Sequence, residues 1–362
     1  GVVLLIAACT MSGPLAPDAA ASLDIPARYD ATQPPVPQIA NKLLNLFNDR
    51  GLRTTVQRAM GGTPDLRASF ARYEEAGFNV RSTAAPLYPS LTAAAGAGRR
   101  STPLLPAANF VEANLIARWE LDVWGRIRSG VTAACADQTA AAADYESARQ
   151  SIAGQTMLAW FDLIAADRLV DLSERRLASF ESTQNLIARR FDAGTSSLAE
   201  LELSKSDAEN ARADLQARLD QRDQASRLVR VLAGDYPSAS LRAGSWPTLD
   251  RSVPTGLPSD LLRQRPDIDA AYQRIRAADA RVKVAHADLF PSFALTAGGG
   301  RTSSRLSDLA RSSFDSWSLL AELSAPIFDG GQRRAELGAA GKRAEQNYQI
   351  YRSTVLNLSL IH

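Results

Sequence analysis

Residues 111–126 read VEANLIARWELDVWGR. Apolar side chains occupy every second position from Val111 to Val123, and most of the positions between them are polar. A period of two residues predicts a β-strand with one apolar face and one polar face. The stretch is long enough to cross a membrane with lipid on one face and water on the other. An amphipathic strand of a soluble β-sandwich is the alternative that this pattern leaves open.

The same pattern returns later in the chain at a constant offset. The segment PDL at 64–66 recurs 202 positions later as PDI at 266–268, and LYPS at 87–90 recurs as LFPS at 289–292. A second alternating stretch follows and ends at Ile327. Two tandem copies of one unit therefore make up the chain. Each copy is expected to contain a helix, a transmembrane β-hairpin and long helices, which together predict an α+β fold.

We predict strands over about residues 87–99, 110–123, 289–301 and 314–327, and helices over about 50–85, 126–191 and 198–232. The first repeat covers residues 39–249 and the second covers 250–362. No proline interrupts the chain from Ala107 to Tyr236, and turn residues at 192–197 separate the last two helices. These two helices are therefore expected to form a long, coiled-coil-like hairpin.

The amino terminus resembles the lipobox of a bacterial lipoprotein. Residues 1–8 read GVVLLIAA and are followed at once by Cys9, and a Pro- and Ala-rich tether fills 9–38. We expect 1–8 to be part of a signal peptide and Cys9 to receive a covalent lipid. Thr10, in place of the Asp that commonly retains lipoproteins at the inner membrane, favours the outer membrane. An ordinary apolar terminus with a chance cysteine is the alternative.

Composition argues against several function classes. The chain has 41 Lys and Arg against 39 Asp and Glu, so no large basic field favours nucleic acid. Two histidines and two cysteines leave little material for a His-centred triad or a Cys/His zinc site. We expect no catalytic residue, no metal and no cofactor apart from the lipid on Cys9. We therefore expect that the protein is not an enzyme.

Four predicted strands are too few for a closed transmembrane barrel, because the smallest such barrels have eight. Lipid offers no hydrogen-bond partner to an open sheet edge. The sequence therefore requires strands from several copies of the chain, either eight from two copies or twelve from three.

Several motifs resemble those of the outer membrane factor family, the TolC/OprM-type efflux channels. LPSDLLRQRPDI at 257–268 is similar to a signature of that family, and WELDVWGR at 119–126 and IFDGG at 327–331 resemble its two strand-to-helix junctions. RRFDAG at 189–194 resembles its helical tip. The lipidated, NodT-like branch is the nearest fit.

This resemblance implies a homotrimer with a twelve-stranded outer-membrane β-barrel that continues into a periplasmic α-barrel. It implies a passive exit duct for small molecules, with a periplasmic adaptor protein and an inner-membrane RND-type transporter as partners. The positions expected to dock the adaptor at the helical tip are Arg190, Asp192, Gly194 and Ser197. The positions expected to line the lumen, on strand faces, are Glu112, Arg118, Glu120, Asp122 and Glu322. The alternative for these five positions is that they are charged only because they lie on a solvated surface.

Three other interpretations remain open at this point. A type I secretion duct would share the architecture but carry protein, and a lipid-anchored periplasmic coiled-coil protein would have no barrel. An enzyme would need convergent acidic pairs, which the pattern does not indicate. Compared with the first repeat, the second stops at His362 partway along its long helix. We therefore expect an incomplete reading frame, and expect that this chain alone does not form a closed, gated channel.

Overall fold

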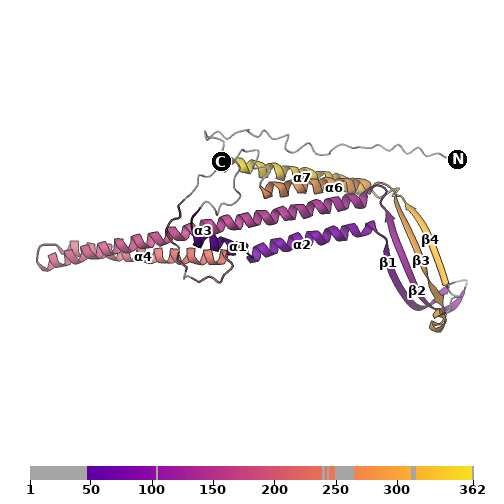
Figure 1. Ribbon diagram of the computed structural model, residues 1–362, viewed down its shortest axis with the longest axis horizontal. Helices are drawn as coiled ribbons and strands as arrows, with labels where there is room; N and C mark the ends of the chain where they lie inside the picture. Colours follow the sequence, from indigo (N-terminus) through magenta and orange to yellow (C-terminus); the bar gives the residue numbers. More distant parts are fainter. Residues whose placement is uncertain are drawn as a thin grey trace. The chain divides into compact units, whose positions relative to one another are not determined.

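The computed structural model describes residues 47–102, 105–238, 241–242, 244–248, 265–310 and 315–360. Cys9, the tether and most of the signature at 257–268 lie outside these residues. In chain order the elements are α1 (Arg50–Met60), α2 (Pro64–Ala84), the 3-10 turn η2 (Ala85–Leu87), β1 (Ser90–Thr102), β2 (Leu105–Leu121), α3 (Arg126–Asp192), α4 (Leu198–Leu232), α6 (Pro266–Ala287), β3 (Ser292–Ser303), η3 (Leu306–Ala310), β4 (Asp315–Ser324) and α7 (Gln332–Leu360) (Figure 1).

The described chain divides into two compact units. One unit contains Arg72–Asp144 and the described residues from 265 onward, and the other contains the described residues up to Ala71 together with those from Tyr145 to Thr248. These units do not coincide with the two sequence repeats. The reason is that strands from both copies hydrogen-bond into one sheet, so the first unit draws on both.

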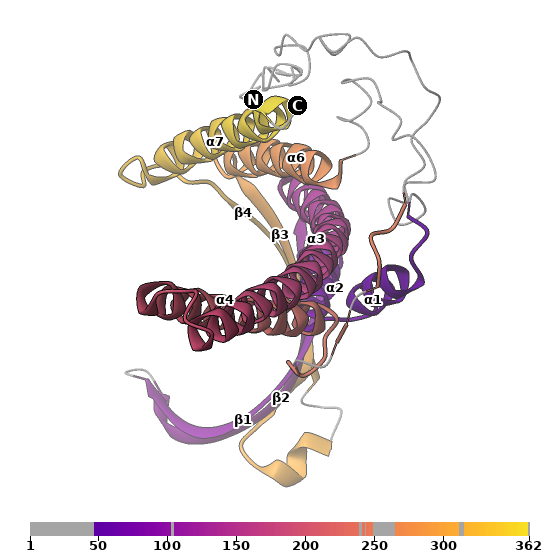
Figure 2. The same ribbon diagram turned by 90° about the vertical axis from the view of Figure 1, so that its left-hand side faces the viewer.

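The sheet has four antiparallel strands in the order β1-β2-β3-β4. Both views show them as one bent sheet (Figures 1 and 2). β2 and β3, from different copies, are the inner strands and have neighbours on both sides, whereas β1 and β4 form the two edges. Glu112 of β2, for example, lies between Gly96 of β1 and Thr302 of β3.

Two helix boundaries show how local sequence shapes the fold. The single helix predicted over 50–85 is two helices, because the chain turns at Gly61 and at Gly62, whose φ of 137° is unfavourable for residues with a Cβ. α3 and α4 span Arg126–Asp192 and Leu198–Leu232, where the sequence predicts 126–191 and 198–232. None of the described helices combines the length and apolarity of a helix that crosses a membrane.

In the first unit, α6 packs through alanines. α6 and α7 lie side by side in both views (Figures 1 and 2). Small side chains let helices approach closely, and two ion pairs, Arg274–Asp144 and Arg281–Asp137, join α6 to the adjoining part of α3. The buried alanines of α6 are Ala270, Ala271, Ala277, Ala278, Ala280 and Ala287.

In the second unit, α1, α3 and α4 enclose an apolar cluster. Leu163 and Ile164 of α3 are fully buried against Val56 of α1 and neighbouring residues. Asp49 organises this end: one carboxylate oxygen accepts from the N–H groups of Gly51 and Leu52 at 2.7 and 3.1 Å. Its other oxygen accepts from Nε1 of Trp160 at 2.9 Å. The cap of α1 therefore also fixes the largest side chain of the cluster. The cluster consists of Leu52, Val56, Met157, Ala159, Trp160, Leu163, Ile164 and Val229.

We predict that Leu163→Ala lowers the free energy of unfolding by about 2–5 kcal/mol, because it leaves a cavity in this cluster. Leu158→Ala on the same helix is the matched control, since Leu158 is 66% exposed, and it should change stability by no more than about 0.5 kcal/mol. Denaturant unfolding in detergent, followed by the helical circular dichroism signal, measures both. Equal losses for the two variants would contradict this account of the core.

Candidate functional site

The register of the sheet places four of the predicted lumen residues on one face. Directly opposed residues of neighbouring strands share a face. Glu112 and Arg118 lie opposite Thr302 and Thr296 of β3, and Glu120 lies opposite Ala294, which in turn lies opposite Glu322 of β4. The even-numbered residues of the four strands therefore form one face with five charged side chains: Arg100 of β1, opposite Ala108, and the predicted Glu112, Arg118, Glu120 and Glu322.

The opposite, odd-numbered face is mainly apolar, with Arg99, Arg301 and Asp315 on it at the end of the sheet away from the helices. Six of its large apolar side chains are between 38% and 84% exposed, and Leu320 is an exposed leucine that lies on the polar face instead. A patch of this kind marks a surface that contacts lipid or another chain. These six residues are Leu91, Leu115, Trp119, Trp317, Leu319 and Leu323.

Asp122 does not belong to the strand face, which corrects the prediction for this residue. β2 ends at Leu121, and the Asp122 carboxylate accepts hydrogen bonds from the N–H groups of Ile127 and Arg128, both at 2.9 Å. Nε of Arg128 lies 3.1 Å from the same carboxylate. Asp122 therefore caps the first turn of α3 and offsets the positive end of its dipole.

The environment of Asp122 favours its charged form. Burial alone raises the pKa of this carboxyl, but the hydrogen bonds from the Arg128 and Ile127 backbones and from the Arg128 side chain outweigh burial. The pKa of Asp122 therefore lies below its ordinary value. Gly125, with a φ of 73°, makes the turn that brings the carboxylate over the helix start.

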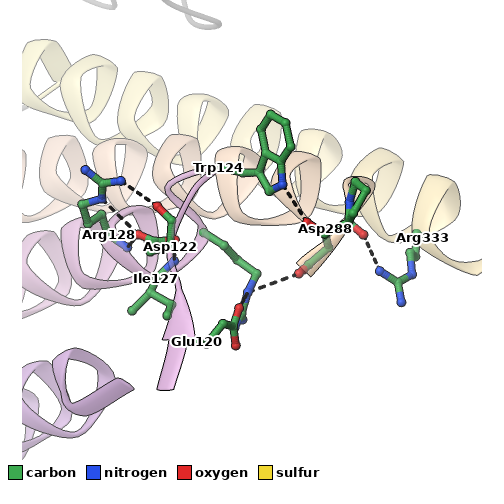
Figure 3. Close-up of polar contacts among 9 residues, drawn as sticks. Glu120, Asp122, Trp124, Ile127, Arg128, Asp288 and Arg333 are labelled. Carbon is green, nitrogen blue, oxygen red and sulfur yellow. Dashed lines mark hydrogen bonds and ion pairs between the residues drawn. The ribbon is translucent and has the colours of Figure 1, made fainter. Parts of the chain in front are cut away.

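Beside this cap, a polar network joins the two repeats (Figure 3). Nη2 of Arg126 donates to both oxygens of Glu120 at 2.8 Å, and Nε of Arg126 lies 3.7 Å from Asp288, just beyond α6. The carboxylate of Glu120 raises the pKa of Arg126. Nη1 of Arg333 on α7 donates to the backbone oxygen of Asp288. These residues line a small cavity of about 140 Å³ at the helix end of the sheet.

Trp124 also joins the two repeats, through its aromatic side chain. Its Nε1 donates to the backbone oxygen of Pro291 at 2.7 Å, and its ring stacks on Phe290 with centroids 4.8 Å apart. Trp124 comes from the first repeat and the other two residues from the second. The junction therefore fixes one hairpin to the next at the point where strands become helices.

The second repeat contains a similar cap at Asp329. Its carboxylate accepts from the N–H groups of Gly331 and Arg333 at 3.0 and 3.3 Å. Gly330 and Gly331 have φ values of 67° and 89°. The sequence marks this site through the motif IFDGG, but the capping role of Asp329 was not predicted from it. An aspartate directly before two glycines and a helix is the signal that identifies it.

The four residues predicted at the helical tip lie together at the turn between α3 and α4. The backbone oxygen of Arg190 accepts from the N–H of Thr195 at 2.8 Å, and Gly194 has a φ of 70°. Ser197 caps α4 in a capping box with Glu200. Asp192 is the last residue of α3, and it is exposed like Arg190 and Gly194.

Glu200 is a tip residue that sequence reasoning missed. Hydrogen bonds from the Ser196 hydroxyl and the Ser197 backbone lower the pKa of its carboxyl. The spacing Ser-x-x-Glu from 197 to 200 is a known sequence signature of a helix start and could have identified it. Among the residues that the structure describes, no three His, Cys, Asp or Glu side chains gather in a way that could hold a metal ion.

The model of the family described as outer membrane efflux protein matches residues 55–235 and 257–360. The chain belongs to the outer membrane efflux protein family. Outer membrane protein OprJ of Pseudomonas aeruginosa is 32% identical over 318 residues, which are 85% of this chain and 66% of OprJ. Cation efflux system protein CusC of Escherichia coli K12 is 27% identical over 369 residues, which are 98% of this chain and 79% of CusC.

A solved structure shows the same fold. The crystal structure of a membrane protein from Pseudomonas aeruginosa has a TM-score of 0.82 and 30% identity, and the match covers 90% of this chain and 80% of that one. The resemblance that the sequence motifs indicate is thereby confirmed at the level of the family. The α+β architecture with two tandem units is confirmed as well.

We predict that Asp122→Asn in this efflux family member destabilises the fold by about 1 kcal/mol near neutral pH, because α3 loses its charged cap. Since folding lowers the pKa of Asp122, its stabilisation is present above the unfolded value of about 3.9 and is lost as pH falls through the lower folded value. Unfolding measured by circular dichroism from about pH 7 downward should show the wild type and the variant converge in acid.

Asp171→Asn serves as the control, because Asp171 is an exposed residue of the same helix that pairs with Arg168 at 3.4 Å. An exposed pair of this kind contributes little, so the variant should stay close to the wild type at every pH. A pH-independent loss in Asp122→Asn would show that its charge is not what stabilises the junction.

Proposed function

We propose that copies of this chain form the outer-membrane exit duct of a tripartite efflux system and conduct small molecules passively to the exterior. The observation that supports this most is the sheet, which has one apolar face, one polar face and two open edges. Such a sheet fits a wall between lipid and a water-filled channel once its edges are paired. Membership of the outer membrane efflux protein family supports the same role.

Three copies supply twelve strands, and this homotrimer is the assembly we favour over two copies with eight. In either case the polar face lines the lumen. Of the four predicted lumen residues on this face, Glu120 is held by Arg126 at the strand end, so Glu112, Arg118 and Glu322 are the ones most available to solutes. Polar walls of this kind let hydrated solutes pass without binding them tightly.

Two parts of the chain, the helical tip and the amino terminus, are the ones that we propose to contact an adaptor protein and the membrane. We propose that the exposed turn with Arg190, Asp192, Gly194 and Ser197 docks a periplasmic adaptor protein, which connects the duct to an inner-membrane RND-type transporter. We further propose that Cys9 anchors the chain to the outer membrane through a covalent lipid. The energy for transport comes from the pump partner, and the duct itself acts neither as an enzyme nor with a cofactor beyond this lipid.

Experiments must distinguish the proposed efflux duct from two alternative functions. A type I secretion duct would have the same architecture with a protein cargo, and genes for an adaptor and an RND-type pump beside this one would favour small-molecule efflux. A lipid-anchored coiled-coil protein would use the helices alone and leave the sheet without a role. The exposed apolar face of the sheet argues against this second alternative.

We expect Glu112→Cys to react with a membrane-impermeant maleimide in outer membranes and Ala113→Cys to remain unlabelled. These neighbours lie on opposite faces of β2, so the first faces water and the second faces lipid. Both variants are made with Cys135→Ser, which removes the exposed cysteine of α3. Labelling of both positions to the same extent would exclude a membrane-embedded sheet.

Removal of the lipid tests the coiled-coil alternative. In a chain expressed behind an intact signal peptide, Cys9→Ala should leave the protein in the outer-membrane fraction, because the sheet remains embedded. A protein held only by its acyl chains would instead be released to the soluble periplasmic fraction. Cys135→Ala is the matched control. Release of the Cys9 variant would overturn the proposed function in favour of the anchored coiled coil.

A further inference from the structure

On all four strands the apolar face ends at a polar residue. Counted from the helix end of the sheet, the odd-numbered positions of β1 and β3 are apolar or glycine until Arg99 and Arg301. Those of β2 and β4 are apolar until Asn109 and Asp315, which lie directly opposite the two arginines. Two cross-strand pairs of polar residues therefore bound the apolar face at the end away from the helices.

The position of these pairs along the strands corresponds to the surface of a membrane. Arg99 lies eight residues beyond Leu91, and Arg301 lies eight residues beyond Phe293. At about 3.4 Å per residue and a tilt of about 40°, this length rises roughly 20 Å along the membrane normal. The apolar band of a transmembrane β-sheet is about 25 Å tall. In a membrane-embedded sheet both arginines therefore lie near the level of the lipid headgroups.

The two arginines differ in the residue that lies opposite each of them. Nε of Arg301 donates to the carboxylate of Asp315, with which it forms an ion pair. Arg99 lies opposite Asn109, whose amide carries no charge, and both of these residues are exposed. Among the residues that the structure describes, no carboxylate forms an ion pair with Arg99. The second hairpin therefore supplies the counter-charge of its own arginine, and the first hairpin does not.

A charged arginine on a lipid-facing surface needs an anionic or polar partner. The cost of its charge is smallest at the headgroup level, where phosphate is the abundant anion. A guanidinium group and a phosphate group fit one another in a bidentate pair. The side-chain amide of Asn109, directly across from Arg99, offers two further N–H donors. Together the two side chains present the donors that a phosphate accepts.

The apolar surface beside this pair suits acyl chains. Three exposed alanines lie between Leu91 and Arg99 on the same face of β1, and Leu115 of β2 lies next to them. Small side chains leave a shallow strip on which hydrocarbon chains can make close contacts. A ligand that combines a phosphate with acyl chains therefore matches both parts of this surface.

We propose that Arg99 and Asn109 bind the phosphate of a lipid in the outer leaflet of the outer membrane, whereas Asp315 neutralises Arg301 within the chain. The proposal rests on the proposed function, which embeds the sheet in that membrane with the helices on the periplasmic side. The ligand is a phosphorylated glycolipid of that leaflet. Its phosphate contacts Arg99, and its acyl chains lie along the alanines toward Leu91.

Binding of lipid A, the phosphorylated glycolipid of that leaflet, tests the site. The full chain is purified in detergent and titrated with lipid A, and native mass spectrometry counts the molecules bound per chain. Arg99→Gln should weaken binding about tenfold, because it removes charge-assisted hydrogen bonds to the phosphate. Arg100→Gln is the matched control, since Arg100 lies on the other face with its Cζ 4.8 Å from the centre of the Phe110 ring. This control should bind lipid A like the wild type.

Exchange of the facing residues gives a test that a misfolded variant cannot imitate. Asn109→Asp gives the first hairpin the carboxylate of the second, and it should weaken lipid A binding as Arg99→Gln does. Asp315→Asn removes the carboxylate that pairs with Arg301, so it should create a second site and raise the number of lipid A molecules bound per chain. The proposal is wrong if either variant binds lipid A as the wild type does.

Two further probes distinguish the lipid from its phosphate. Lipid A without its phosphates should bind the wild type about tenfold more weakly than intact lipid A. Inorganic phosphate at the same concentration should not displace intact lipid A, because it has no acyl chains. Equal binding of the phosphate-free lipid would show that the acyl chains alone are recognised. Full displacement by inorganic phosphate would show a site for the free ion, and either result overturns the proposal.

Maleimide labelling of Glu112→Cys and Ala113→Cys separates this proposal from the proposed function. Labelling of Glu112→Cys alone, together with wild-type lipid A binding by Arg99→Gln, would overturn the phosphate site and leave the duct in place. Equal labelling of the two positions would remove the membrane-embedded sheet, and the phosphate site would fall with it.

Discussion

The backbone groups along the outer edges of β1 and β4 set the requirement on which the rest of the structure depends. Each inner strand has neighbours on both sides, whereas each outer strand has one. In water an open edge can bond to solvent, but in hydrocarbon every unpaired N–H or C=O costs several kcal/mol. A sheet with the exposed apolar face seen here therefore needs other strands at its edges, and a four-stranded chain must obtain them from other copies.

The junctions at Asp122 and Asp329 follow from this requirement. Each must change a flat, two-faced strand into a helix within a few residues, and both use the same physical means. A carboxylate accepts from the first free N–H groups of the helix, and a glycine with positive φ makes the turn. The link from Trp124 to Pro291 then ties one hairpin to the next. Polar contacts at the strand-to-helix junctions thus fix the strands of the first unit to its helices.

Much of this architecture can be read from the sequence, because period-two alternation and a fixed offset are local, additive signals. The even and odd faces of the sheet follow directly from them, as Glu112 and Glu322 show. Single turns are harder to predict. Gly61 and Gly62 divide the helix predicted over 50–85, because two adjacent glycines allow a turn that neighbouring helix formers cannot prevent.

Asp122 shows a different limit of sequence reasoning. In the alternation it occupies a polar position of the strand, but its carboxylate satisfies helix N–H groups five and six residues later. The pattern alone contains no information about where a ladder ends, since that depends on the partner strand and its proline. The same reason accounts for the end of β4 at Ser324, where Pro291 closes the ladder from the other side.

Ser90 pairs with Arg118 and Ser292 with Ser324, so β3 follows β1 at an offset of 202 positions and β4 follows β2 at an offset of 206. The difference between these two offsets shows which parts of the duplicated unit are constrained. Nine residues separate Arg99 from Asn109, and thirteen separate the equivalent pair, Arg301 and Asp315. The four additional residues fall in the connection between β3 and β4, outside the pairs that these two strands form with each other. Within the strands no residue can be added singly without moving a whole face from lipid to water. Duplication therefore tolerates change at this hairpin end and preserves the register within each hairpin, because a shift in one strand would move its apolar side chains to the polar face.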